Sequence, residues 1–94
     1  ENLMFEISAK PIQIFLDFNA VIVNLDALSP ENQIKCLTDI EANVKTLKSY
    51  LEENLKAKEN VPEIPQTGLA VLQQQFVLAQ SIETWIEELK LKYE

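Results

Sequence analysis

The residues most capable of chemistry are two carboxylates near the C-terminus. Glu83 and Glu87 stand four positions apart, so on a helix they would share one face. Carboxylate oxygens bind Mg²⁺ or Ca²⁺, and a divalent-metal hydrolase is the activity that such a pair would support. Helical hydrolases of this type pair glutamates three positions apart on facing helices, a spacing that no predicted helix offers. We therefore rank this activity last and predict no metal or other cofactor.

Nucleophilic catalysis lacks its usual partners in this chain. Cys36 is the single cysteine, and there is no histidine. Cys–His and Ser–His mechanisms need an imidazole to activate the nucleophile, and a structural zinc site needs several Cys or His ligands. Because Cys36 precedes the apolar position Leu37, we interpret it as a small buried or flanking thiol. These absences predict a protein that is not an enzyme.

The charge balance excludes a nucleic-acid partner. Fifteen acidic residues face eight lysines, there is no arginine, and the net charge is −7. Binding to DNA or RNA needs a positive surface, for which arginine is preferred. Acids and lysines in the middle of the chain alternate at spacings of four, as in Glu41 with Lys45 and Glu52 with Lys56. Such pairs are typical of a solvated helix surface.

The most apolar stretch, residues 11–28, does not predict a membrane span. Asp17, Asn19, Asn24 and Asp26 interrupt it, and a charge at the centre of a bilayer costs roughly 2.5–3.5 kcal/mol. The first residues have no basic segment followed by an apolar one, so we expect no signal peptide. A single cysteine also suits a reducing compartment. We therefore predict a cytoplasmic protein without a membrane segment.

Apolar periodicity predicts three helices that position all of these residues. Three stretches carry apolar side chains in alternating steps of three and four, which places them on one stripe of a helix. The stripes are Ile14, Phe18, Val21, Leu25 and Leu28, then Leu37, Ile40, Val44, Leu47, Leu51 and Leu55, then Leu69, Leu72, Phe76, Ala79, Ile82, Ile86, Leu89 and Tyr93.

Capping residues and prolines set the predicted helix boundaries. Ser8 can cap a first helix, and Ser29 followed by Pro30 is a strong start for a second. Pro62 and Pro65 interrupt the chain before a third. We predict an all-α fold in one domain over residues 1–94, an up-down-up three-helix bundle with helices over about 8–28, 30–59 and 66–93.

The first segment also fits a strand. The residues Ile12, Ile14, Leu16, Phe18, Ala20 and Ile22 alternate with Gln13, Asp17 and Asn19, a period of two that is typical of β-structure. We favour a helix because the three-four stripe continues to Leu28 and no second strand is evident to pair with the first.

The first and third predicted helices are more apolar than a three-helix monomer needs. Large exposed apolar patches usually mark contact surfaces, so we expect a homodimer or a complex with another protein. The predicted partner-binding residues lie beside or opposite the main stripes and are Leu16, Val23, Val77, Trp85 and Leu91. Alternatively, the bundle buries more than the pattern indicates, with Leu3, Met4 and Phe5 covering its ends.

These observations predict a non-enzymatic helical module for protein–protein interaction or oligomerisation. The alternative is a carrier or sensor that holds a small apolar ligand between helices, for which large aromatic side chains such as Trp85 could line a cavity.

Overall fold

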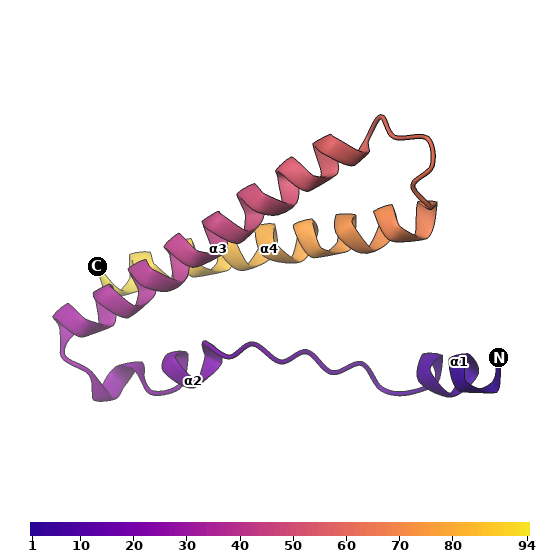
Figure 1. The fold of residues 1–94 in the computed structure, drawn as a ribbon. Coiled ribbons are helices and arrows are strands. Elements are labelled where there is room, and N and C mark those ends of the chain that lie inside the picture. The colour runs from indigo at the N-terminus through magenta and orange to yellow at the C-terminus, as the bar shows by residue number, and fades with distance from the viewer.

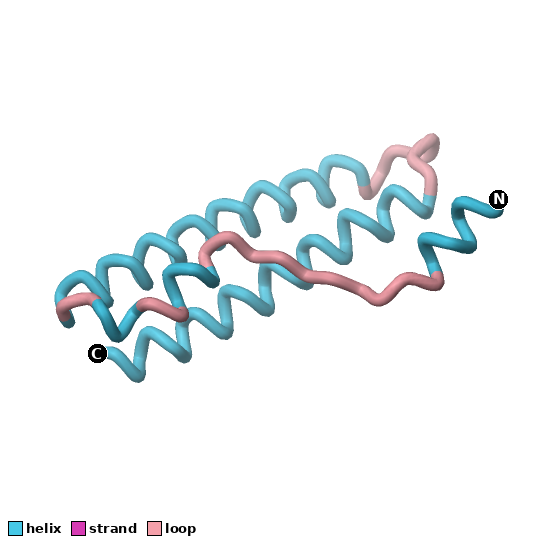
Figure 2. Tube along the Cα trace, turned by 90° about the horizontal axis from the view of Figure 1, so that it is seen from below, coloured by secondary structure: helices cyan, strands magenta, loops and turns pink.

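The computed structural model describes residues 1–94 and is all-helical, with no strand. Its elements in chain order are α1 (Asn2–Ser8), α2 (Asn19–Ile22), the 3₁₀ helix η1 (Leu25–Ala27), α3 (Pro30–Lys58) and α4 (Gln66–Tyr93). The long helices α3 and α4 form an antiparallel hairpin, and the first seventeen residues form an N-terminal arm beside it (Figures 1 and 2). The predicted second and third helices differ from α3 and α4 by at most one residue at each end.

Local sequence explains where α3 begins and ends. The Ser29 hydroxyl accepts a hydrogen bond from the Asn32 N–H at 3.3 Å, and Pro30 occupies the first turn, where its missing N–H costs nothing. At the other end, Lys56 and Lys58 lie next to the negative end of the helix dipole. The proline-containing link that follows returns the chain to α4.

A narrow apolar seam joins the two long helices. Its buried side chains recur every seven residues on each helix, which is two turns and keeps them on one stripe. Together with Leu25 from η1, the buried core consists of Leu37, Val44, Leu51, Ala79 and Ile86. Only six of the 94 residues are buried, so the core is small for a chain of this length.

Two ion pairs between the helices flank this seam. The Lys48 ammonium donates to Glu83 Oε1 at 2.9 Å, and the Lys90 ammonium donates to Glu41 Oε1 at 3.3 Å. The hydrogen bond to Glu83 raises the pKa of Lys48 above its ordinary value, so Lys48 stays charged at neutral pH. The partners are 35 positions apart in the sequence in the first pair and 49 positions apart in the second. Because both pairs connect the two helices, they favour one register of the hairpin.

The predicted first helix over residues 8–28 is wrong. The Ser8 hydroxyl donates to the Phe5 carbonyl at 3.1 Å, so Ser8 closes α1 instead of capping a new helix. Pro11 has no N–H and disfavours a helical conformation at Lys10. The chain is then extended without a partner strand until the turn at Asp17. The alternating pattern therefore describes residues 11–16 better than the helical one does, but it does not describe α2, which is helical.

A second break follows α2. The Asn24 side-chain amide donates to the Ala20 carbonyl at 2.7 Å, and residues 23 and 24 form a turn before η1. Because the first helix is absent, this single copy shows two packed long helices in place of a three-helix bundle.

Leucine-to-alanine substitutions should separate core from surface. Leu37→Ala removes a fully buried side chain and should lower the free energy of unfolding by about 2–5 kcal/mol. Leu91→Ala, at a side chain that is 70% exposed, should change it by less than about 0.5 kcal/mol. Chemical denaturation followed by circular dichroism measures both values. Equal effects of the two substitutions would contradict this placement of the core.

Candidate functional site

The candidate site is the apolar groove between the arm and the hairpin. Phe18 stacks on Trp85 of α4 with ring centroids 6.0 Å apart and an angle of 28° between the planes. Beyond Phe18, η1 fixes the chain to α3, because the Gln33 side-chain amide donates to the Leu25 carbonyl at 3.0 Å. The groove is therefore anchored at the end where α2 and η1 lie, and the arm leaves the hairpin on the N-terminal side of Leu16.

Leu16 divides the groove into two apolar cavities. The first has a volume of about 330 Å³ and is lined by Ile14, Leu16, Asn19, Leu78, Ser81, Ile82 and Trp85. The second has a volume of about 240 Å³ and is lined by Leu16, Phe18, Ile40, Asn43, Val44, Leu47 and Ile82. Leu16 and Ile82 line both cavities, so the arm covers the groove only in part.

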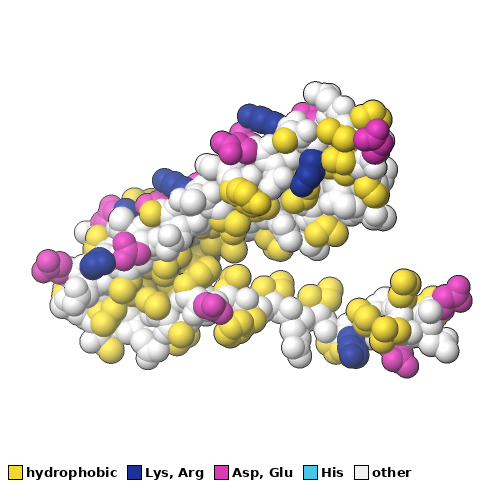
Figure 3. All heavy atoms as spheres, viewed as in Figure 1, with side chains coloured by type: hydrophobic (Ala, Val, Ile, Leu, Met, Phe, Trp, Pro, Cys, Tyr) yellow, Lys and Arg dark blue, Asp and Glu magenta, His cyan; other side chains and the backbone are white.

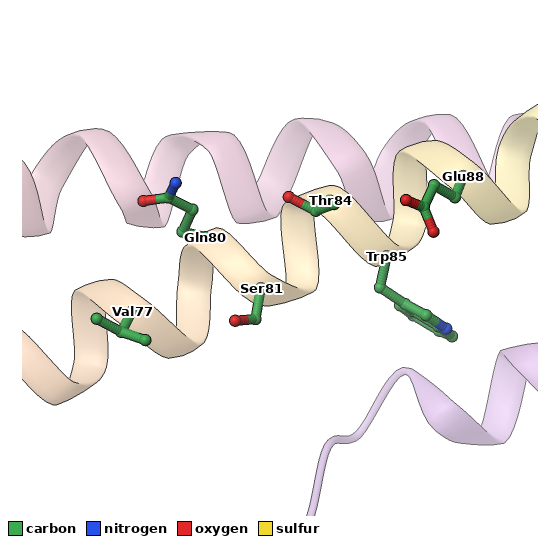
Figure 4. A pocket seen from close by; sticks show the side chains of 6 residues that line it. All are labelled: Val77, Gln80, Ser81, Thr84, Trp85 and Glu88. Carbon is green, nitrogen blue, oxygen red and sulfur yellow. The ribbon is translucent and has the colours of Figure 1, made fainter.

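A third hollow, of about 540 Å³, lies on the surface of α4 (Figure 4). All of its lining residues come from this one helix, and they are Val77, Gln80, Ser81, Thr84, Trp85 and Glu88. The Trp85 ring points from it towards the N-terminal segment (Figure 4). The two hydroxyl groups have no histidine to activate them, so this hollow carries no recognisable catalytic arrangement.

The predicted contact residues occupy different places. Leu16 and Trp85 line one cavity, and Val77 shares the hollow of α4 with Trp85. Val23 is 79% exposed in the turn after α2, and Leu91 lies near the end of α4. Neither of these two lines the groove cavities or the hollow of α4.

The most exposed apolar residues lie in the arm. Ile12 is 91% exposed and Phe15 is 85% exposed. The other large apolar side chains of the arm that are exposed are Leu3, Met4, Phe5, Ile7 and Ile14. In this copy Leu3, Met4 and Phe5 therefore cover no core. An extended segment with no partner strand buries few of its side chains, and only Leu16 and Phe18 of residues 11–18 are partly buried.

The total accessible surface of the chain is larger than that of a compact monomer. It amounts to 7536 Å², whereas a compact monomer of 10.7 kDa exposes about 5,500 Å². The difference is about 2,000 Å². The radius of gyration, 17.3 Å, likewise exceeds the value of about 12 Å expected for a compact chain of this length.

Charges are scarce on the surfaces that remain open. The arm segment Pro11–Leu16 has none, and neither does α4 from Gln66 to Ile82. Apolar side chains line the side of the hairpin that faces the arm, whereas the outer side of α3 carries many of the visible lysines and acids (Figure 3). An uncharged apolar centre with a charged surround is typical of protein interfaces.

Glu83 and Cys36, the residues that the sequence offered for metal binding and for nucleophilic chemistry, lie in different surroundings. Glu83 is held by Lys48, and no group of three or more Cys, Asp or Glu side chains is positioned to hold a metal ion. Cys36 is a free thiol that packs, partly buried, against the core.

Comparison with protein families, with curated proteins and with solved structures finds no match to this chain. None of the helices combines the length and hydrophobicity that crossing a bilayer requires.

The Phe18–Trp85 stack should report the attachment of the arm. Trp85 is the only tryptophan, and an aromatic pair contributes about 0.5–1.5 kcal/mol beyond its buried area. In dilute solution, Phe18→Ala should make Trp85 fluorescence more sensitive to acrylamide quenching. The matched substitution Phe5→Ala, in α1, should leave quenching unchanged. Identical quenching in both variants would show that Phe18 does not cover Trp85.

Proposed function

We propose that this protein is a non-enzymatic self-association module, a homodimer held together by the arm and the groove. The observation that carries the proposal is the uncovered surface of about 2,000 Å² per chain, estimated against a compact monomer. If two copies covered this surface, they would bury about 4,000 Å² in total, which is within the range of obligate dimers.

Complementarity within one chain favours a second copy as the partner. The chain carries both a projecting apolar segment around Ile12 and Phe15 and an apolar groove, between the arm and the hairpin, that the arm covers only in part. A dimer with two-fold symmetry needs such a self-complementary pair, because each surface meets the other twice.

The charge distribution supports the same partner. Two copies with a net charge of −7 each repel one another. Thirteen of the fifteen acidic residues lie outside residues 1–16 and 66–82, so contact through the arm and the first part of α4 keeps most carboxylates away from the interface.

The free thiol of Cys36 suits a reducing environment, and we place the protein in the cytoplasm.

Light scattering after gel filtration, over a range of concentrations, tests the proposal. The wild-type chain should reach twice its monomer mass. Ile12→Lys combined with Phe15→Lys should return it to one chain, because two desolvated ammonium groups would stand in the interface. Both side chains are exposed, so the variant should fold normally by circular dichroism.

The single substitution Leu91→Lys is the control, because Leu91 lies about 180° around α4 from Ile82 of the groove. It should leave the dimer intact. A wild-type chain that stays monomeric at all concentrations would refute self-association. A dimer that Ile12→Lys and Phe15→Lys do not weaken would refute the role of the arm.

A second candidate function is the binding of a small apolar ligand. It is favoured by the cavity of about 330 Å³ beside Trp85, whose lining is mostly hydrophobic and whose size is at the lower end of ligand pockets. Native mass spectrometry of the purified protein tests this function. A retained ligand that Ile82→Trp displaces would support it, and a mass equal to that of the bare chain would count against it.

A further inference from the structure

The groove has two halves, which the arm of the same chain covers unequally, because Ile14 is the arm residue nearest the N-terminus that lines it. Leu16 and Phe18 lie over Ile40, Val44 and Ile82. Towards the loop end of the hairpin, Leu47, Val71 and Leu78 remain about half exposed. Leu47 shares one cavity with Leu16 and Phe18, and Leu78 shares the other with Ile14 and Leu16, so the arm covers these two side chains only in part. Val71 lines neither cavity and precedes Leu78 by seven residues on the same stripe of α4.

The arm is long enough to place α1 beyond this open half of the groove. Along α4, Val71 is eleven residues from Ile82, or about 16 Å at the helical rise. Along the extended arm, Ser8 is eight residues from Leu16, or up to about 26 Å. Figure 1 shows α1 at the same end of the molecule as the loop between α3 and α4, but well separated from α4 and from the groove. The apolar side chains of α1 therefore remain exposed.

From this geometry, and resting on the proposed function, we infer that the dimer forms by reciprocal arm exchange. The arm of each copy, with α1, covers the open half of the partner's groove at Leu47, Val71 and Leu78. The partner's arm does the same in return. Each groove then has three layers, which are α3 and α4 of one chain and the arm of the other.

The surfaces to be joined are chemically matched. The α1 side chains Leu3, Met4, Phe5 and Ile7 are flexible or aromatic and apolar. The part of α4 that would receive them has no charge over its first seventeen residues. In α1, Glu6 is the only charged residue, so the exchange leaves few ionic groups to desolvate.

Thiol cross-linking distinguishes exchange from other arrangements. In a Cys36→Ser background, a chain carrying Ile7→Cys and Val71→Cys is treated with a short bismaleimide at concentrations where light scattering shows a dimer. Both positions are exposed, so the substitutions should not disturb the fold. Exchange predicts that the main product is a covalent dimer on a denaturing gel.

The control pair combines Ile7→Cys with Lys35→Cys, since the Lys35 side chain is 70% exposed on α3; it should give little covalent dimer. A covalently closed monomer from the Ile7→Cys and Val71→Cys chain would overturn exchange, because the arm would then fold back on its own groove. A non-covalent dimer without the cross-link would also overturn exchange while leaving self-association in place. A monomer before cross-linking would overturn both.

Discussion

The apolar seam between α3 and α4 is the interaction on which the remaining structure depends. Leu37, Val44 and Leu51 on one helix face Ala79 and Ile86 on the other, and two ion pairs fix the direction and register. Each fully buried aliphatic side chain contributes about 1.5–3 kcal/mol. Without this seam neither helix would hold its amphipathic face, and the groove beside them would not exist.

A hairpin of two helices cannot bury all of its apolar side chains. It buries one stripe of each helix, but Leu47, Leu78 and Trp85 lie on neighbouring stripes and stay partly in water. In many helical proteins a third helix covers these stripes. Here the chain supplies an extended arm in place of that helix, and the arm covers the stripes only near Phe18. Association of two copies would complete the core that a single copy leaves unfinished.

The sequence predicted the structure correctly where a single signal acted at a position, and less well where several signals competed. Ser29 and Pro30 had no competing role, so the start of α3 was predicted correctly. Ser8 could act either at the start or at the end of a helix, and its hydrogen bond to Phe5 closes α1. Residues 12–22 fitted both periods, and Pro11 favoured the extended form at the start of this stretch.

The groove could be predicted from sequence only in part. Leu16 and Trp85 were identified because they stood outside the main stripes, and both line the groove. Val23 was assigned to a helix face that does not form, because Asn24 turns the chain by bonding to Ala20. The exposure of Ile12 and Phe15 depends on the path of the arm relative to the hairpin, which is a long-range property that local periodicity does not encode.

Hydroxyl-radical footprinting of the arm over a range of protein concentrations tests the central claim most directly, because it measures the exposure of individual side chains. We predict strong labelling of Phe5 and Phe15 in dilute solution and a clear decrease as the concentration rises, while labelling of Leu91 stays constant. Labelling of Phe5 and Phe15 that is independent of concentration would contradict the account, since the arm would then never be covered by a second copy.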